Sequence, residues 1–305
     1  MKKLLQVLVI AMITTATLAA VSAETARSTV SLNGTWQFRM LAPEGDWTKL
    51  DVPGHWGLAG HRLPIWWGGG WEEKALYRRP VNIPGDWQDD RIFLRFGGVN
   101  NLAIVRIDGD EIGQHASGYT AFEYEITDKV EPGRTHQLEV EVHTFGPFHK
   151  FDNLDFWHLV GIYRPVTLEA RPAEHITDWH YRTDWHAEKG QADVWIGGQV
   201  ASNRTGADTR MLRVQLNDLH TEPAQAVAGK CVIDDDGTFE TTLHVDQPRG
   251  WTAETPNLYR VQLELTNKKG KLIDSVEEDI GLREIETRNG KLLVNGRPIR
   301  LFGAA

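Results

Sequence analysis

Apolar and polar residues alternate with a period of two along most of this sequence, and that pattern restricts the chain to β-structure. In residues 137–142 (QLEVEV) the leucine and valines fall on one side and the polar residues on the other, as a half-buried antiparallel strand requires. Residues 259–265 (YRVQLEL) repeat the pattern. After the first residues, no long stretch follows the period of an amphipathic helix. The sequence therefore predicts an all-β protein.

Short turn motifs separate the predicted strands. Asp108-Gly109 follows the apolar run 102–107 and precedes Glu111-Ile112, which is typical of a hairpin. The motif NKKG at 267–270 separates two further runs in the same way. Many short strands joined by turns, without crossover helices between them, favour β-sandwiches over a parallel sheet.

The length of the chain and a break in its pattern predict two main domains. About 280 residues follow the N-terminal segment, which exceeds the common size of one domain. The strand-like pattern stops at a proline-containing link, residues 170–172, and resumes at His175. We expect one domain over residues 28–171 and a second over 172–280, the latter about the length of one immunoglobulin-type sandwich.

The first residues have the pattern of an export signal. Lys2 and Lys3 precede an apolar run over 4–20, and the small residues Val-Ser-Ala at 21–23 resemble a cleavage site. A membrane anchor is the alternative, but the run is short for a spanning helix and contains three threonines. We expect residues 1–23 to be a signal peptide and the protein to be exported, to the periplasm or the outside of the cell.

Composition excludes several kinds of site and partner. Cys231 is the only cysteine, so an intrachain disulfide and a cysteine-ligated metal site are excluded. The net charge is −9, and loss of the two signal lysines would make it −11. Nucleic acids and anionic membranes are poor partners for such a surface. Stability must come from buried apolar side chains.

Several phrases resemble glycoside hydrolase family 2, the family of β-galactosidases, β-glucuronidases and β-mannosidases, and they occur in the family's order. These phrases are SLNGTWQF at 31–38, VPGHW at 52–56, YRR at 77–79 with RIFLRFGGV at 91–99, DFWHLVGIYRPV at 155–166, AETPNLY at 253–259, and GLREI at 281–285 with VNGRPI at 294–299. The resemblance implies a jelly-roll (galactose-binding-like) sandwich followed by an immunoglobulin-like sandwich. It also implies that residues 281–305 are a hairpin leading into a (β/α)₈ barrel, which is otherwise absent.

In that family two barrel glutamates hydrolyse the glycosidic bond with retention, from carboxyl groups about 5 to 5.5 Å apart. No residue of this sequence corresponds to either glutamate. The resemblance therefore assigns no catalytic residue to the chain and implies that the chain alone is inactive and requires no cofactor.

Two positions match residues at the sugar site of the family. Asn100 matches an asparagine that reaches the sugar, and Asp155 matches an aspartate that contacts a sugar hydroxyl and a sodium ion. Carboxylate and amide groups suit hydroxyl recognition because both offer acceptors and the amide adds donors. The remaining sodium ligands would come from the barrel. The alternative is that Asn100 ends a strand and Asp155 caps a loop.

Tryptophans crowd the segment that follows VPGHW. Trp66, Trp67 and Trp71, with Trp56 before them, could stack on sugar rings. Packing between this domain and the barrel is the stronger interpretation, because tryptophans cover large areas at interfaces.

These observations lead to one main hypothesis and two alternatives. The main hypothesis is the non-catalytic N-terminal part of an exported retaining glycosidase that cleaves O-glycosidic bonds, acts on a terminal β-linked sugar and shapes the rim of the active site. Galactose is the first choice of sugar, from Asn100 and Asp155, and glucuronate the second, from GIYRP at 161–165. The alternatives are a free-standing carbohydrate-binding protein and a structural remnant of a truncated gene.

Overall fold

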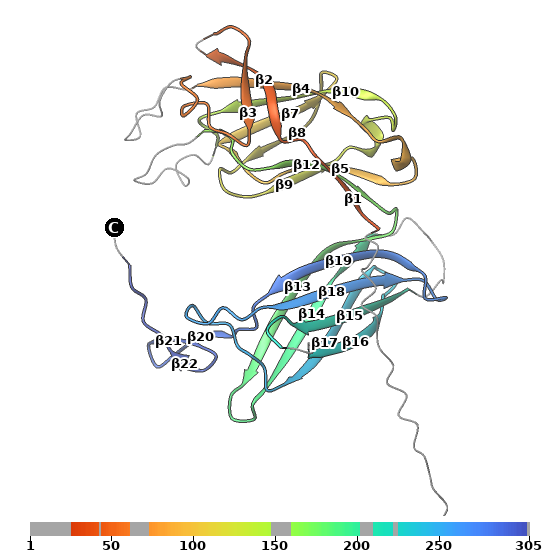
Figure 1. Cartoon of the computed structure of the whole chain (residues 1–305), viewed down its shortest axis with the longest axis vertical. Helices are drawn as coiled ribbons and strands as arrows, with labels where there is room; N and C mark the ends of the chain where they lie inside the picture. Colours follow the sequence, from red (N-terminus) through yellow and green to blue (C-terminus); the bar gives the residue numbers. More distant parts are fainter. Residues whose placement is uncertain are drawn as a thin grey trace, which may run out of the picture.

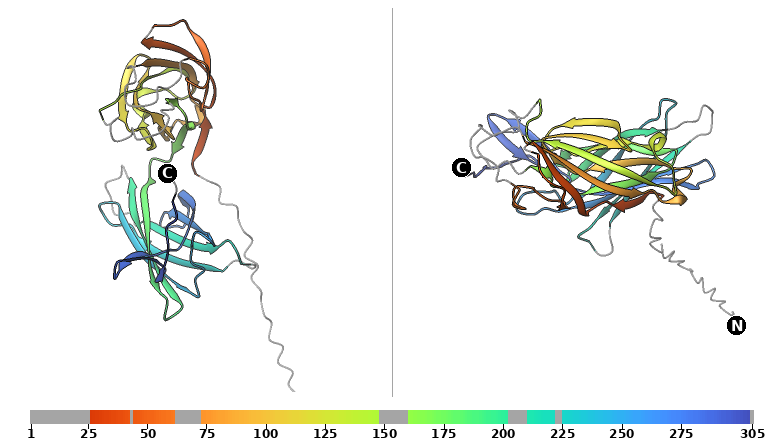
Figure 2. Two further views of the ribbon diagram at one scale, coloured as in Figure 1. Left: turned by 90° about the vertical axis from the view of Figure 1, so that its left-hand side faces the viewer. Right: turned by 90° about the horizontal axis from the view of Figure 1, so that it is seen from above.

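The computed structural model describes residues 26–42, 44–61, 73–147, 160–201, 210–221 and 225–303. These residues form two β-sandwiches, one above the other in Figure 1, and a small three-stranded sheet beside the lower one. The left view of Figure 2 shows the same two tiers from the side. The described residues contain two single 3-10 turns, η1 (Gly85–Trp87) and η2 (Thr127–Lys129), and no (β/α)₈ barrel. The all-β prediction is confirmed.

The first sandwich has the two antiparallel layers of a jelly roll. One sheet has the strand order β3-β2-β4-β10-β7-β8 and the other β1-β12-β5-β9, while β6 and β11 form a short ribbon. The strands are β1 (Ser28–Ser31), β2 (Gly34–Ala42), β3 (Thr48–Val52), β4 (Lys74–Asn82), β5 (Arg91–Phe96), β6 (Val99–Asn100), β7 (Leu102–Ile107), β8 (Asp110–Ala116), β9 (Phe122–Glu125), β10 (Thr135–His143), β11 (Gly161–Ile162) and β12 (Val166–Arg171).

Alternation and turn chemistry place these strands as the sequence predicts. Along β10, Leu138, Val140 and Val142 are buried, while the polar residues between them lie partly exposed. The hairpin between β7 and β8 turns at Asp108 and Gly109, whose φ values are 52° and 91°. Two successive positive φ values are required by the two-residue turn that matches strand twist, and aspartate and glycine tolerate them.

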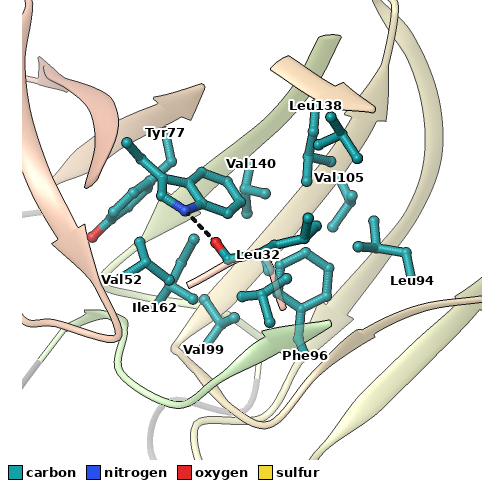
Figure 3. Packing of buried hydrophobic residues seen from close by; sticks show 14 of the residues in the cluster. Leu32, Val52, Tyr77, Leu94, Phe96, Val99, Val105, Leu138, Val140 and Ile162 are labelled. Atoms are coloured by element: carbon teal, nitrogen blue, oxygen red, sulfur yellow. Dashed lines mark hydrogen bonds between the residues drawn. The ribbon is translucent and has the colours of Figure 1, made fainter. Parts of the chain in front are cut away.

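The core between the two sheets combines large aromatic side chains with aliphatic ones. Figure 3 shows the hydrogen bond that Trp36 Nε1 donates to the carbonyl oxygen of Leu32, 2.9 Å away. Trp36 also meets Tyr77 edge to face. Burial of each large side chain of this kind contributes about 1.5–3 kcal/mol relative to exposure, and the hydrogen bond to Leu32 satisfies the buried indole N–H of Trp36.

The second sandwich is immunoglobulin-like, with seven strands in sheets of three and four. The sheets have the orders β13-β14-β17 and β16-β15-β18-β19, so that the fourth strand, β16, joins the sheet of β15. The strands are β13 (His175–His186), β14 (Gln191–Ala201), β15 (Met211–Asp218), β16 (Ala226–Val232), β17 (Thr238–Asp246), β18 (Tyr259–Thr266) and β19 (Leu272–Ile280). Its core contains Val194, Ile196, Leu212, Val261 and Leu263, all almost fully buried.

A three-stranded meander follows, formed by β20 (Ile285–Arg288), β21 (Lys291–Val294) and β22 (Arg297–Pro298). The sequence predicts a last strand over 297–302, but β22 ends at Pro298, so that prediction is too long. Leu301 and Phe302 are 80% and 92% exposed. The Ile299 amide still donates to the carbonyl oxygen of Leu292 on β21, at 3.0 Å, but the strand pairing of β22 covers only Arg297 and Pro298.

Arg27 joins the two sandwiches just before β1. Its guanidinium donates to both carboxylate oxygens of Asp274 on β19, at 2.9 and 2.8 Å, and to the carbonyl oxygen of Ile176, at 2.6 Å. The same group lies 3.2 Å from Glu169 on β12. The Asp274 side chain is fully buried and also accepts the Ile176 amide proton. This junction fixes the lower edge of the first sandwich to the second.

In the part of the chain that the structure describes, no helix is long and apolar enough to cross a membrane.

Candidate functional site

Asn100 lies at the end of β6, where the short β6–β11 ribbon leaves the jelly roll. It pairs with Gly161, and its neighbour Val99 pairs with Ile162. Asn100 is only 4% exposed. Its side-chain amide makes no hydrogen bond with any described residue, and its nitrogen and oxygen are not among the fully buried unpaired side-chain atoms of the described residues.

The residue after it is anchored from two sides. The Asn100–Asn101 peptide bond is cis. The backbone amide of Asn101 donates to the carbonyl oxygen of His143, at 3.1 Å. Its side-chain oxygen accepts the backbone amide of Gly146, at 3.0 Å. These contacts fix the end of β6 to the segment that leaves β10, so Asn100 is held by backbone neighbours while its own amide remains available.

A buried carboxylate supports the same end of the sandwich. Glu73 is 8% exposed, and its side chain accepts a hydrogen bond from Trp56 Nε1, at 3.3 Å. Its backbone amide donates to the Thr144 hydroxyl, at 3.0 Å, and its carbonyl oxygen accepts the Thr144 amide, also at 3.0 Å. Trp56 is fully buried, so of the four crowded tryptophans this one packs inside the sandwich.

Glycine is required where β11 passes the turn at residues 52–56. Gly161 has a φ of 127°, and a Cβ there would lie 2.7 Å from the Tyr77 hydroxyl and 2.8 Å from the carbonyl oxygen of Gly54. The Gly54 amide in turn donates to the carbonyl oxygen of Ile162, at 2.8 Å. The backbone of β11 lies so close to this turn that only a residue without a side chain fits at position 161. Gly161 pairs with Asn100, so the turn also fixes the position of the β6–β11 ribbon.

Charges near the site are already paired. His143 Nε2 lies 2.7 Å from one oxygen of Glu141, and Arg106 donates to the other at 2.9 Å. Burial by itself would raise the pKa of Glu141, but the bonds from His143 and Arg106 outweigh it and lower that pKa. The Glu141 carboxylate is therefore ionised and bonded to His143 and Arg106, and it is not available as a proton donor.

Four of the five predicted site residues lie outside the described residues: Asp155, Trp66, Trp67 and Trp71. Their predicted roles, including sodium binding by Asp155, stay predictions. Within the described ranges no three histidine, cysteine or acidic side chains converge to hold a metal ion. Of the predicted residues, the structure therefore places Asn100 alone.

Sequence reasoning missed the framework around Asn100. Glu73 and Thr144 are 71 positions apart in the chain, and neither carries a local motif. Asn101 adjoins the predicted residue, but its two anchoring bonds cross to another strand end. The only sequence signal for this framework is the pair of adjacent asparagines at the end of an apolar run.

Comparison with known proteins identifies the family. Residues 29–172 match the model described as the sugar binding domain of glycosyl hydrolases family 2, and residues 174–283 match a second model of the same family. The chain belongs to glycoside hydrolase family 2. The family resemblance noted in the sequence is confirmed.

Individual family 2 relatives match nearly the whole chain but only part of themselves. A β-galactosidase of Priestia megaterium is 28% identical, over 90% of this chain and 30% of that protein. One of Photobacterium profundum is 29% identical, over 90% and 29%. The crystal structure of a Bacteroides uniformis β-glucuronidase has a TM-score of 0.74 and 26% identity, over 90% of this chain and 35% of that one. The chain thus spans about 30% of the curated relatives' length and corresponds to their N-terminal part.

Proposed function

We propose that this chain is the non-catalytic N-terminal part of an exported retaining glycosidase, in which Asn100 contributes to the rim of the sugar site. One observation carries the proposal beyond family membership: Asn100, a residue that is only 4% exposed, has a side-chain amide with no hydrogen-bond partner among the described residues. Such an amide offers two donors and an acceptor. A sugar hydroxyl is a partner of matching chemistry.

Galactose is the sugar we propose first. Asn100 and Asp155 are neutral and anionic acceptors for hydroxyl groups, and the two relatives described above are named β-galactosidases. Glucuronate is second, because the chain also resembles a β-glucuronidase in fold. Its carboxylate needs a cation, and Arg164 of the segment 161–165 already donates to the carbonyl oxygens of Gly97 and Tyr119.

The decisive test begins with the coding DNA beyond Ala305. An open reading frame that continues into a (β/α)₈ barrel supports the proposal, and an authentic stop codon contradicts it. In the longer product, Asn100→Ala is expected to lower kcat/KM for a nitrophenyl galactoside by about tenfold to a hundredfold, equivalent to about 1.4–2.8 kcal/mol. Asn217→Ala, on β15 of the second sandwich, is the matched control and should leave kcat/KM unchanged.

The chain alone provides a second test. It should release no nitrophenol from galactoside, glucuronide or mannoside substrates, because the proposal places both catalytic carboxylates elsewhere. Turnover that persists after removal of contaminating enzymes would disprove that assignment. N-terminal sequencing of the secreted protein tests the export signal, with Glu24 as the expected first residue.

The free-standing carbohydrate-binding alternative makes a different prediction for calorimetry. It requires the chain alone to bind a monosaccharide through Asn100, with heat abolished by Asn100→Ala. Heats equal to buffer dilution for galactose, glucuronate and mannose would remove that alternative and leave the main proposal intact.

A further inference from the structure

The outer face of the three-stranded sheet of the second sandwich carries one tryptophan at its centre. Trp195 lies on the central strand β14, opposite Arg182 on β13 and Thr242 on β17. Its neighbours in the chain, Val194 and Ile196, point into the core. Trp195 therefore lies on the side of the sheet away from the core, where it is partly exposed.

The indole lies along the sheet because the next outward position is a glycine. A Cβ on Gly197 would come within 2.6 Å of both Cζ2 and Cη2 of Trp195. The six-membered ring thus covers the backbone of Gly197, which is itself buried. Any larger residue at 197 would push the ring away from the sheet. Glycine at this position allows a flat orientation of the ring.

A hydrogen bond fixes the ring within the plane of the sheet. Trp195 Nε1 donates to a carboxylate oxygen of Glu240 on β17, at 3.2 Å. His180 on β13 meets the ring edge on, with centroids 5.0 Å apart and planes at 62°. The guanidinium carbon of Arg182 lies 5.6 Å from the ring centroid. The indole is therefore held in place before any ligand arrives, which reduces the entropy lost on binding.

Exposed polar groups surround the ring on both neighbouring strands. Arg182, His180, Glu240 and Thr242 are all exposed, and together they offer donors, acceptors and groups that do both. Asp193, two positions before Trp195, is bonded on its two oxygens by His244 and His186, at 2.6 and 3.1 Å. A flat apolar surface bordered by such groups complements a pyranose ring, which has an apolar C–H face and a hydroxyl-bearing edge.

We infer that this face, centred on Trp195, is a binding surface for neutral oligosaccharides. The net charge of −9 and the carboxylates at 193 and 240 disfavour acidic chains. The surface lies on the second sandwich, whereas Asn100 lies on the first. The inference therefore does not depend on the proposed rim role of Asn100.

A second exposed tryptophan, Trp47, serves as the control because its surroundings are less suited to sugar binding. Trp47, 39% exposed, lies in the first sandwich with the guanidinium carbons of Arg39 and Arg78 4.9 and 4.5 Å from its ring centroid. Two arginines occupy its surroundings more closely than the single Arg182 at Trp195. Both tryptophans are near the surface, so loss of either should affect folding to a similar, small extent.

The test is isothermal calorimetry of the full chain with cellotetraose, xylotetraose, mannotetraose and galactotetraose, and with trigalacturonate as the acidic comparison. At least one neutral tetrasaccharide should bind with a dissociation constant on the order of 0.1–1 mM. Trp195→Ala should weaken that binding at least tenfold, and Trp195→Phe, which keeps an aromatic ring, should fall between. Trp47→Ala should bind like the unaltered chain.

Several results would overturn the inference. It is wrong if no neutral tetrasaccharide binds, if Trp195→Ala binds as tightly as the unaltered chain, or if trigalacturonate binds more tightly. Loss of binding in Asn100→Ala, with Trp195→Ala unchanged, would place the sugar on the first sandwich instead. Melting curves of all variants must coincide within about 2 °C for the comparison, a shift of less than about 1 kcal/mol.

Discussion

Replacement of Arg27 by alanine is expected to destabilise the junction between the two sandwiches. The change removes three hydrogen bonds to Asp274 and Ile176 and an ion pair with Glu169. Asp274, whose side chain is fully buried, would retain only the bond from the Ile176 amide. Its carboxylate would then be a buried charge without a counter-ion.

The expected cost follows from that burial. Removal of one partner of a buried pair costs about 3–5 kcal/mol. The Arg27 side chain is 18% exposed, so water can partly replace it, and we expect the lower end, about 3 kcal/mol. For a domain of this size each kcal/mol shifts Tm by about 2–4 °C, which gives a fall on the order of 6–12 °C.

Differential scanning calorimetry of the purified chain measures this shift. Arg213→Ala is a matched control, because Arg213 is an exposed strand arginine with no ion pair to a described residue, and it should cost less than about 0.5 kcal/mol. Arg27→Lys keeps the charge but not the planar fork, and should fall between the two. If Arg27→Ala melts within about 1 °C of the unaltered chain, the junction does not stabilise the protein as argued.

Two further predictions concern pH and packing. Burial alone would raise the pKa of Glu169, but bonds from Arg171 and Arg27 lower it. The stability that this ionised group contributes is therefore fully present above its unfolded pKa of about 4.5, and it is lost as the pH falls through the lower pKa of the folded state. Tm should fall on acidification, and it should fall less in Glu169→Gln. A Cβ at Gly198 would lie 2.2 Å from the carbonyl oxygen of Asp178, so Gly198→Ala should lower the free energy of unfolding in urea by about 1–3 kcal/mol. Gly45, an exposed glycine with room for a Cβ, provides the control. An equal loss of stability in Gly198→Ala and Gly45→Ala would refute this prediction.

The sequence by itself determined the fold class and which face of these strands is buried. The alternation in residues 137–142 and 259–265 is a local property, since each residue's side of the sheet follows from its parity. These segments form the central strands β10 and β18. The turns at Asp108-Gly109 and Asn295-Gly296 are equally local, because aspartate, asparagine and glycine accept positive φ at their own positions. The resemblance to family 2 then predicted that one sandwich is a jelly roll and the other immunoglobulin-like.

Only the tertiary structure decided which distant groups meet. Arg27 and Asp274 are 247 positions apart, and no local sequence pattern near either residue predicts their contact. Trp195 appears in the sequence as one more residue of an alternating strand, and its flat orientation depends on Gly197 and on Glu240 from another strand. Contacts of this kind depend on how sheets and domains pack, and the alternating pattern of a strand specifies which face is buried but not which groups lie across from it.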